Sequence, residues 1–138
     1  MQEHLLSHYV DSLHRDVSFF CGEKLRKKGI SVGLMYFILY VCKHPGCTPA
    51  QLARDLELDR AYVLRTINKL VENGFFRRED HPTDGRATIL YATEKGEEIF
   101  TMSRDLLHSW DMYMLEGMTE SEKEQLFMLL NKIQQKGK

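Results

Sequence analysis

Two helix-start signals lie close together near the middle of this chain, and they constrain its fold more than any other feature. In the stretch TPAQLARDLEL, Thr48 is a candidate N-cap, Pro49 takes the first helical position and Gln51 can complete a capping box. The stretch LDRAYVLRTINKLVENGF follows almost immediately, with Asp59 as its N-cap and Gly74 as its C-terminal stop. Two helices joined by so tight a turn predict a helix-turn-helix.

A β-hairpin is predicted directly after these helices, at residues 76–92. The flanking stretches FFRRE and ATILYAT are rich in aromatic and β-branched residues, and HPTDG between them contains Pro, Asp and Gly, which favour turns. This places Asp84, Gly85 and Arg86 at the tip of the hairpin. A hairpin this short is not stable alone, so it must pack on a larger fold.

Amphipathic helices are predicted on both sides of this central part. Residues 5–28 form the first helix, which stops at Gly29, and Ser31 opens a second that ends at the KHPG stretch. After the hairpin, Thr93 caps a helix to about residue 117, and Thr119 opens a last helix through a second capping box. The apolar stripes of the end helices contain Leu6, Val10, Leu13, Val17 and Phe20, then Ile99, Met102, Leu106, Trp110 and Tyr113, and finally Leu126, Leu129, Leu130 and Ile133.

The expected fold class is mainly α (α+β), in one domain of 138 residues. A winged helix-turn-helix at residues 31–93 lies between long N- and C-terminal dimerisation helices at residues 1–30 and 94–138. Their apolar stripes are too broad for a small central domain to cover, so packing against a second copy predicts a homodimer. A monomeric bundle whose ends pack on each other is the alternative.

Several classes of protein are not indicated by the sequence. The longest apolar run, LMYFILYVC, is too short to cross a membrane, and no signal-peptide pattern begins the chain, so a cytoplasmic protein without a membrane partner is expected. Cys21, Cys42 and Cys47 are an odd number without zinc-like spacing, which disfavours disulfides and a cysteine metal site. The chain has no phosphate-binding glycine loop, HExxH or GxSxG motif, so neither an enzyme nor a cofactor is predicted.

Residues 48–96 carry a resemblance to the MarR family of bacterial winged-helix transcription regulators, and it extends over nearly the whole chain. They include a helix-turn-helix, an L-x-x-x-G helix ending, a D-x-R wing and a Thr-x-x-Gly start of the next helix. The chain departs from the family at His81, where the wing more often begins Asp-Pro. It also departs at Tyr62 and Leu64, where the recognition helix usually has small polar residues.

The resemblance implies that the wing contacts DNA. A narrow minor groove attracts an inserted guanidinium, and Arg86 is the candidate for this contact. Asp84 is expected to orient Arg86 through a bidentate ion pair, and Gly85 to permit the tight turn that presents both residues. The alternative is that Asp84 and Arg86 only close the hairpin.

The helix-turn-helix supplies the other candidate contacts. N-terminal residues of a recognition helix reach base edges in the major groove, and basic residues further along reach guanine or phosphate. The start of the preceding helix can bind phosphate, and a solvated polar face is the alternative for any single residue. The candidates are Arg60, Ala61 and Tyr62 for bases or thymine methyl groups, Arg65 for guanine or phosphate, Lys69 for phosphate, and Thr48 and Gln51 for phosphate.

Overall charge does not by itself indicate nucleic acid. The net charge is -1, and residues 54–88 contain seven basic and seven acidic side chains. The binding face can be positive only if Asp55, Glu57, Glu72, Glu79 and Asp80 face away from DNA. In that case binding is expected to be strongly salt-dependent.

A small-molecule effector is a further partner that the resemblance implies, because family members commonly bind aromatic or phenolic compounds between the dimerisation helices and the winged domain. Arg15 is a candidate partner for a ligand carboxylate, or else for an acid across the dimer. Tyr36, Leu107 and Trp110 are candidate lining residues, although aromatic residues at helical spacing are more often core.

Other hypotheses remain beside this one. A redox response would need positive charge near Cys21, which Lys24 can supply from one turn away. His4 and His8 have the spacing of two metal ligands on one helical face, but further ligands are missing, so no metal is expected. A winged-helix module that binds only proteins is the alternative from another class.

The sequence therefore predicts a sequence-specific DNA-binding transcription regulator that binds a pseudo-palindromic operator as a homodimer. Half-sites should be centred roughly 10 bp apart or a small multiple of that distance. Repression is the commoner outcome in the family, and activation is the other.

Overall fold

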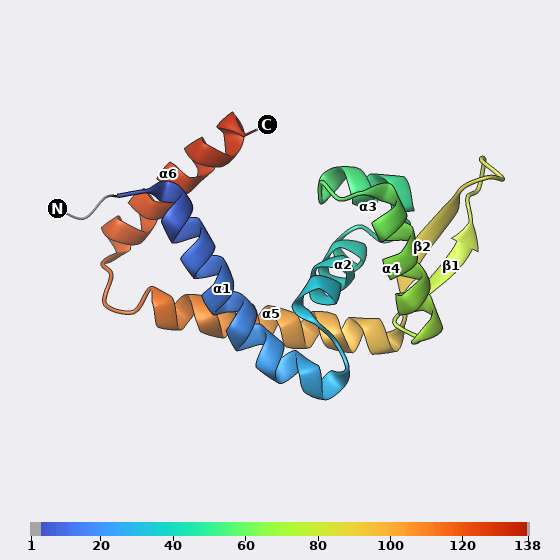
Figure 1. The fold of residues 1–138 in the computed structure, drawn as a ribbon, viewed down its shortest axis with the longest axis horizontal. Helices are drawn as coiled ribbons and strands as arrows, with labels where there is room; N and C mark the ends of the chain where they lie inside the picture. Colours follow the sequence, from blue (N-terminus) through green and yellow to red (C-terminus); the bar gives the residue numbers. More distant parts are fainter. Residues whose placement is uncertain (1–3, 138) are drawn as a thin grey trace. The chain divides into compact units, whose positions relative to one another are not determined.

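The structure is a computed structural model that describes residues 4–137, so the outermost ends of the predicted dimerisation segments, residues 1–3 and 138, lie outside the described residues. Its mainly helical order with one hairpin confirms the predicted fold class (Figure 1). The elements are α1 (Leu6–Leu25), the 3-10 helix η1 (Arg26–Lys28), α2 (Val32–Lys43), α3 (Pro49–Asp55), α4 (Arg60–Glu72), β1 (Phe76–Asp80), β2 (Thr88–Ala92), α5 (Glu94–Met114) and α6 (Glu120–Lys136).

Helix boundaries follow the predicted local signals. Thr48 Oγ1 accepts a hydrogen bond from the Gln51 N–H (3.1 Å), and Gln51 Oε1 accepts one from the Thr48 N–H (2.8 Å), which completes the capping box of α3. Asp59 caps α4 by accepting from the Tyr62 N–H (3.1 Å). Gly74 ends α4 in the left-handed conformation, with φ 82°. The first helix ends earlier than predicted, because residues 26–28 tighten into η1.

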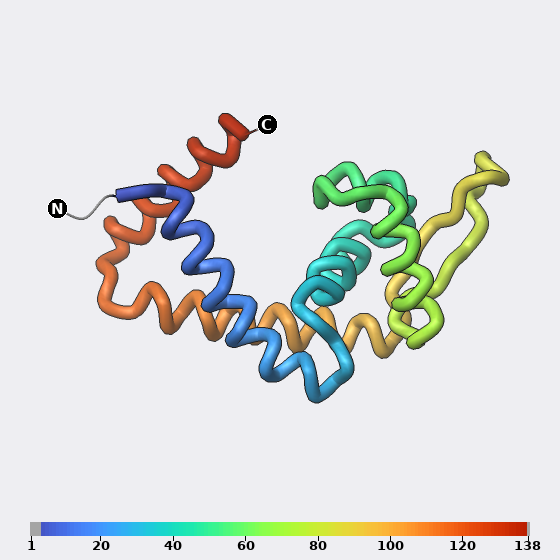
Figure 2. Tube along the Cα trace, in the orientation of Figure 1, coloured from blue at the N-terminus to red at the C-terminus, as the bar shows by residue number. Residues whose placement is uncertain are grey.

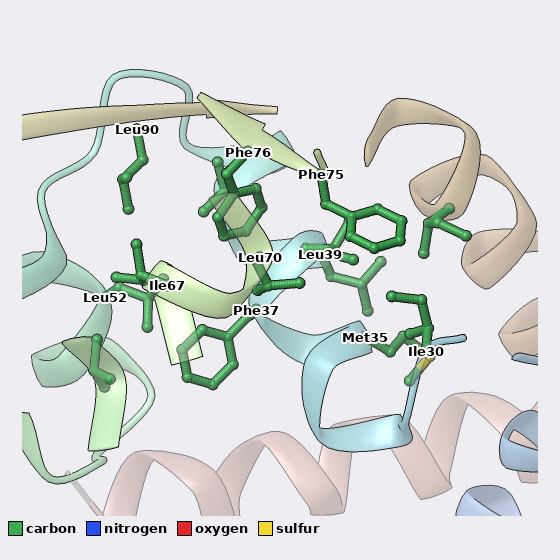
Figure 3. Close-up of a cluster of buried hydrophobic side chains, with 14 of the residues drawn as sticks. Ile30, Met35, Phe37, Leu39, Leu52, Ile67, Leu70, Phe75, Phe76 and Leu90 are labelled. Carbon is green, nitrogen blue, oxygen red and sulfur yellow. The ribbon is translucent and has the colours of Figure 1, made fainter. Parts of the chain in front are cut away.

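The described residues form two compact units, 4–107 and 108–137. The first unit contains α1 to α4, the hairpin and the beginning of α5. Its core is built from apolar side chains that converge from α2, α3, α4 and the hairpin (Figure 3). Burial of a large apolar side chain contributes about 1.5–3 kcal/mol, so these contacts hold the short helices in place. The labelled core residues are Ile30, Met35, Phe37, Leu39, Leu52, Ile67, Leu70, Phe75, Phe76 and Leu90.

The inner face of α4 is buried as the helical pattern predicts. Val63, Ile67 and Leu70 are buried, and Val71 is half-buried against the same core. Thr66, which was not predicted to face inward, is also buried and donates a hydrogen bond to the Tyr62 carbonyl (2.8 Å). The residues between these positions are left on the outer face of α4.

The hairpin pairs β1 with β2 in antiparallel register, from Phe76 opposite Ala92 to Asp80 opposite Thr88. It extends as an arm beside α4 (Figure 2). The other edge of β2 is also paired: the Leu90 N–H donates to the Cys47 carbonyl (2.8 Å) just before α3. The wing is thus joined by backbone hydrogen bonds to the segment that starts the helix-turn-helix.

The end helices carry apolar side chains that this chain alone leaves exposed. In α1, Leu6, Val10 and Leu13 are about half exposed, whereas Val17 and Phe20 pack against the core. In α5, Ile99 and Leu106 are buried, and α6 buries no residue. The exposed apolar residues of α6 are Phe127, Met128, Leu129, Leu130 and Ile133.

Candidate nucleic-acid interface

A groove of about 490 Å³ lies where α3, α4 and the wing meet, and it gathers several of the predicted contact residues. Thr48 lies at the start of α3, Arg60 at the start of α4, and Asp84 and Arg86 at the wing tip. Two arginines and one aspartate give the lining a local excess of positive charge that the whole chain lacks. The lining residues are Thr48, Pro49, Ala50, Arg60, Leu64, His81, Asp84, Arg86, Ala87 and Thr88.

The outer face of α4 presents the remaining candidates to solvent. Arg60, Ala61, Arg65 and Lys69 are all exposed, because the buried positions of the helix lie between them. Tyr62 is 41% exposed, and its ring packs edge-on against Phe37 with 6.0 Å between ring centroids. Tyr62 therefore also contacts the core through one edge of its ring.

Leu64 was missed as a site residue by sequence reasoning. It is 46% exposed and lines the groove, although it is a leucine in an amphipathic helix. The available signal was its position one residue after buried Val63, which turns it outward. An exposed apolar side chain on such a face is suited to contact a thymine methyl group.

Gln51 does not line this groove, although it is hydrogen-bonded to Thr48, which does. It lines a smaller cavity of about 310 Å³ with Tyr40, His44 and Asp55. Its side-chain oxygen is occupied by the capping box. A phosphate contact by Gln51 would therefore use its amide nitrogen.

The wing tip differs from the prediction in two respects. Asp84 Oδ1 accepts a hydrogen bond from the backbone N–H of Arg86 (3.0 Å), and no ion pair joins their side chains within residues 4–137. The predicted bidentate pair is therefore wrong: the carboxylate is used locally to close the turn. Gly85 does not have a positive φ, and a Cβ there would meet no atom within 4 Å, so the turn does not require glycine.

Acidic residues near the groove are held by contacts of their own. Asp55 accepts from Tyr40 Oη (2.6 Å) and from Arg54 Nε (3.2 Å), and these hydrogen bonds lower the pKa of its carboxyl group. Glu79 pairs with Arg77 (3.1 Å), whose guanidinium lies over the Tyr91 ring. Neither acid lines the groove.

Comparison with known proteins agrees with this geometry. Residues 36–88 match the MarR family. A relative from Clostridium symbiosum (strain WAL-14163), the HTH-type transcriptional regulator BilQ, is 40% identical over 131 residues, which cover 95% of this chain and 91% of that protein. This chain belongs to the MarR family. It is a DNA-binding transcriptional regulator with a winged helix-turn-helix, and not an enzyme.

Solved structures of MarR-type regulators share the whole fold. Streptococcus pneumoniae FabT in complex with DNA is 26% identical, with a TM-score of 0.85 and coverage of 94% of this chain and 93% of FabT. A putative MarR family regulator from Listeria monocytogenes, complexed with 26mer DNA, has a TM-score of 0.87 at 20% identity, covering 98% and 89% of the two chains. Both of these proteins bind DNA. At 20% identity, the likeness to the Listeria protein shows a shared fold.

The effector-pocket candidates of this MarR protein differ in their local environments. Arg15 pairs with Asp11 one turn earlier in α1 (2.8 Å), and its side chain remains 71% exposed. Tyr36 is 36% exposed. Desolvation, and to a lesser extent the nearby Cys21, raise the pKa of its phenol. Leu107 packs against the core of the first unit, whereas Trp110 belongs to the second.

The cysteine environments oppose thiolate formation in this MarR chain. Cys21 is fully buried, and burial raises the pKa of its thiol. Lys24 lies over the Phe20 ring at 5.9 Å, which gives its ammonium group a contact other than Cys21. Burial also raises the pKa of Cys42 to about 12 and that of Cys47 to about 11. A redox response at Cys21 therefore has no electrostatic support.

Within residues 4–137, the two histidines with metal-ligand spacing, His4 and His8, both contact Tyr9. His4 Nδ1 lies 3.4 Å from Tyr9 Oη, and the His8 ring packs edge-on against Tyr9. Within this range no three His, Cys, Asp or Glu side chains come together as metal ligands. None of the helices described is long and apolar enough to span a bilayer.

Proposed function

We propose that this MarR-family protein binds a pseudo-palindromic operator as a homodimer and represses transcription. The groove between α3, α4 and the wing carries the proposal, because one surface combines exposed residues of a recognition helix with Arg60 and Arg86. In this proposal residues 31–93 bind DNA, and residues 1–30 and 94–138 dimerise. Two recognition helices enter successive major grooves, and each wing follows the adjacent minor groove.

The proposed contacts divide into two kinds. Arg60, Ala61 and Tyr62 read base edges, together with Leu64, and Arg86 enters the minor groove. Phosphate contacts position the protein without reading sequence, and these are assigned to Thr48, Gln51, Arg65 and Lys69. Asp84 contributes by shaping the wing turn, in keeping with its hydrogen bond to the Arg86 backbone.

The exposed apolar surfaces support the homodimer. Large exposed apolar surfaces are uncommon on monomeric proteins. The helices α1 and α6 each expose several apolar side chains, among them Val10 (59%) and Leu129 (52%). A twofold dimer buries such surfaces against their own copies and sets the spacing of the two recognition helices. An inverted-repeat operator follows from this symmetry.

Release from DNA by a small aromatic or phenolic effector completes the proposal. Any such effector must bind the DNA-incompetent form more tightly than the competent form, because equal affinity shifts no population. Arg15, Tyr36, Leu107 and Trp110 are the residues we assign to the effector site. If Arg15 exchanged Asp11 for a ligand carboxylate, Asp11, whose side chain is 64% exposed, would be left to solvent.

The first test is selection of the purified protein on random duplex DNA, followed by titration of the selected site. We expect an inverted repeat whose affinity falls steeply with salt. Enrichment of no sequence at low salt would contradict the proposal and favour a winged-helix module for protein contacts.

Arg86→Ala tests the wing contact on the selected site. Loss of a specific arginine contact should weaken binding by about 1–3 kcal/mol while the dimer stays intact. Arg77→Ala is the matched control, because Arg77 lies on the same hairpin but does not line the groove. Equal affinities of the Arg86→Ala and wild-type proteins would exclude the proposed role of Arg86.

A further inference from the structure

His81 is the residue around which the wing turn is folded. It is half-buried directly after β1, and its ring Nδ1 accepts hydrogen bonds from the backbone N–H groups of Thr83 (3.2 Å) and Asp84 (3.0 Å). The Thr83 hydroxyl lies 3.4 Å from the same nitrogen. The backbone N–H of His81 donates to the Ala87 carbonyl across the turn (3.1 Å). One residue therefore holds both sides of the loop.

These hydrogen bonds define the protonation state of the ring. A backbone N–H can only donate, so Nδ1 must be an acceptor and cannot carry a hydrogen. The imidazole is thus neutral, with its hydrogen on Nε2. Protonation at Nδ1 would place a hydrogen where two N–H groups already point, and both hydrogen bonds would be lost.

Two further hydrogen bonds connect His81 to the proposed DNA contact. Asp84, whose N–H is held by the imidazole, uses Oδ1 to accept from the Arg86 N–H (3.0 Å). Its carbonyl accepts from the Ala87 N–H (3.1 Å). The backbone on both sides of Gly85 is therefore fixed through Asp84. His81, Asp84 and Arg86 all line the groove.

We propose that His81 is a positioning residue for DNA binding: its neutral imidazole holds the turn that presents Arg86. The role rests on the proposed function of the wing. Without the Nδ1 acceptor, the N–H groups of Thr83 and Asp84 lose their partner and the turn becomes less ordered. DNA binding must then order Arg86, and the entropy lost in doing so lowers the affinity. His81 acts through the backbone and needs no contact with DNA.

Three substitutions separate the acceptor from the size of the ring. In His81→Asn, Oδ1 can occupy the place of Nδ1, so the acceptor remains and cannot titrate. In His81→Gln, the amide reaches the place of Nε2 and leaves a carbon near the two N–H groups. His81→Ala removes both. At about pH 8, we expect DNA affinity to fall about tenfold in the Ala and Gln variants and to stay within about threefold of wild type in the Asn variant.

Hydrogen exchange at the Thr83 and Asp84 amides provides a readout that does not involve DNA. Both amides should be protected at about pH 8 in the wild-type and Asn proteins, and unprotected in the Ala and Gln variants. Protection in the Ala variant, or its loss in the Asn variant, would overturn the role of the imidazole.

Arg86→Ala distinguishes failure of this inference from failure of the proposed function. Its amide protection should match wild type, since the turn uses only the Arg86 backbone. If all His81 variants and Arg86→Ala bind the operator normally, the wing contact itself is wrong, and positioning by His81 falls with it. If only Arg86→Ala weakens binding, the wing contact stands and the positioning role of His81 is overturned.

Discussion

Gly96 shows how a single residue fixes the position of a long helix. A Cβ at this position would lie 2.3 Å from the Phe75 carbonyl oxygen, which is closer than any real contact. Thr93 draws the same two segments together by donating from its hydroxyl to the Gly74 carbonyl (2.5 Å) and by accepting from the Gly96 N–H (3.2 Å). The start of α5 therefore packs backbone to backbone on residues 74–75, which follow α4.

Gly96→Ala should destabilise the protein. The added methyl group must push two backbone segments apart, and overpacking of this kind costs about 1–3 kcal/mol. Urea denaturation of both proteins would measure the difference in the free energy of unfolding. Gly85→Ala is the control, because that position is open and its φ is ordinary, so the change should stay within about 0.5 kcal/mol. A Gly96→Ala protein as stable as wild type would show that the segments separate freely.

At the scale of elements, a hydrogen bond ties α2 to the helix-turn-helix. Tyr40 Oη in α2 donates to Asp55 Oδ2 in α3 (2.6 Å), and the His44 ring packs against Tyr40 with 4.4 Å between centroids. The bond requires a protonated phenol and an ionised carboxylate. Burial, together with Asp55, raises the pKa of Tyr40 to about 12, while this hydrogen bond lowers that of Asp55.

Tyr40→Phe should reduce stability in a pH-dependent way. The pKa of Asp55 is lowered by folding, so its contribution is present above its ordinary pKa of 3.8 and is lost as the pH falls further. The pKa of Tyr40 is raised, so its contribution is present below 10.0 and is lost as the pH rises towards 12. The difference in unfolding free energy between the two proteins should be largest between these limits. A difference independent of pH would attribute the effect to packing.

At the scale of the whole molecule, α1 and α6 carry the apolar side chains that we assign to the dimer interface. Leu13→Glu places a charge on the α1 patch, where Leu13 is 44% exposed. Burial of an unpaired carboxylate is costly, so the variant should sediment as a monomer at concentrations where wild type is a dimer. Leu58→Glu, at another exposed leucine in the α3–α4 turn, should leave the dimer unchanged. Equal masses for the Leu13→Glu and wild-type proteins would place the interface elsewhere.

The symmetry of the proposed dimer also sets the salt dependence of binding. Each phosphate contact adds about 0.9 to the slope of log affinity against log salt concentration, and a dimer makes every contact twice. Lys69→Ala should therefore reduce the slope by about 2 on the selected operator and weaken binding similarly on all sequences. An unchanged slope in fluorescence-anisotropy titrations would remove Lys69 from the phosphate contacts.

Features that depend on neighbours in the chain were predicted well. The caps at Thr48 and Asp59, the stop at Gly74 and the hairpin are set by backbone preferences over a few residues. The α3–α4 turn had no such signal, because Glu57 rather than glycine adopts the left-handed conformation, with φ 55°. The Asp84–Arg86 pair was predicted wrongly, because a nearby backbone N–H competes with the guanidinium for the carboxylate.

By itself, the sequence determined the order of elements and the inner face of α4, since each depends on local propensity and on the period of apolar residues. The family followed from the resemblance carried by residues 48–96. Only the tertiary structure decided which polar side chains share a surface. The groove brings together residues from three parts of the chain, because β2 pairs with the segment before α3. These residues are Thr48, Arg60, His81 and Arg86. Packing and hydrogen bonding between distant segments determine such distances, and no spacing along the chain encodes them.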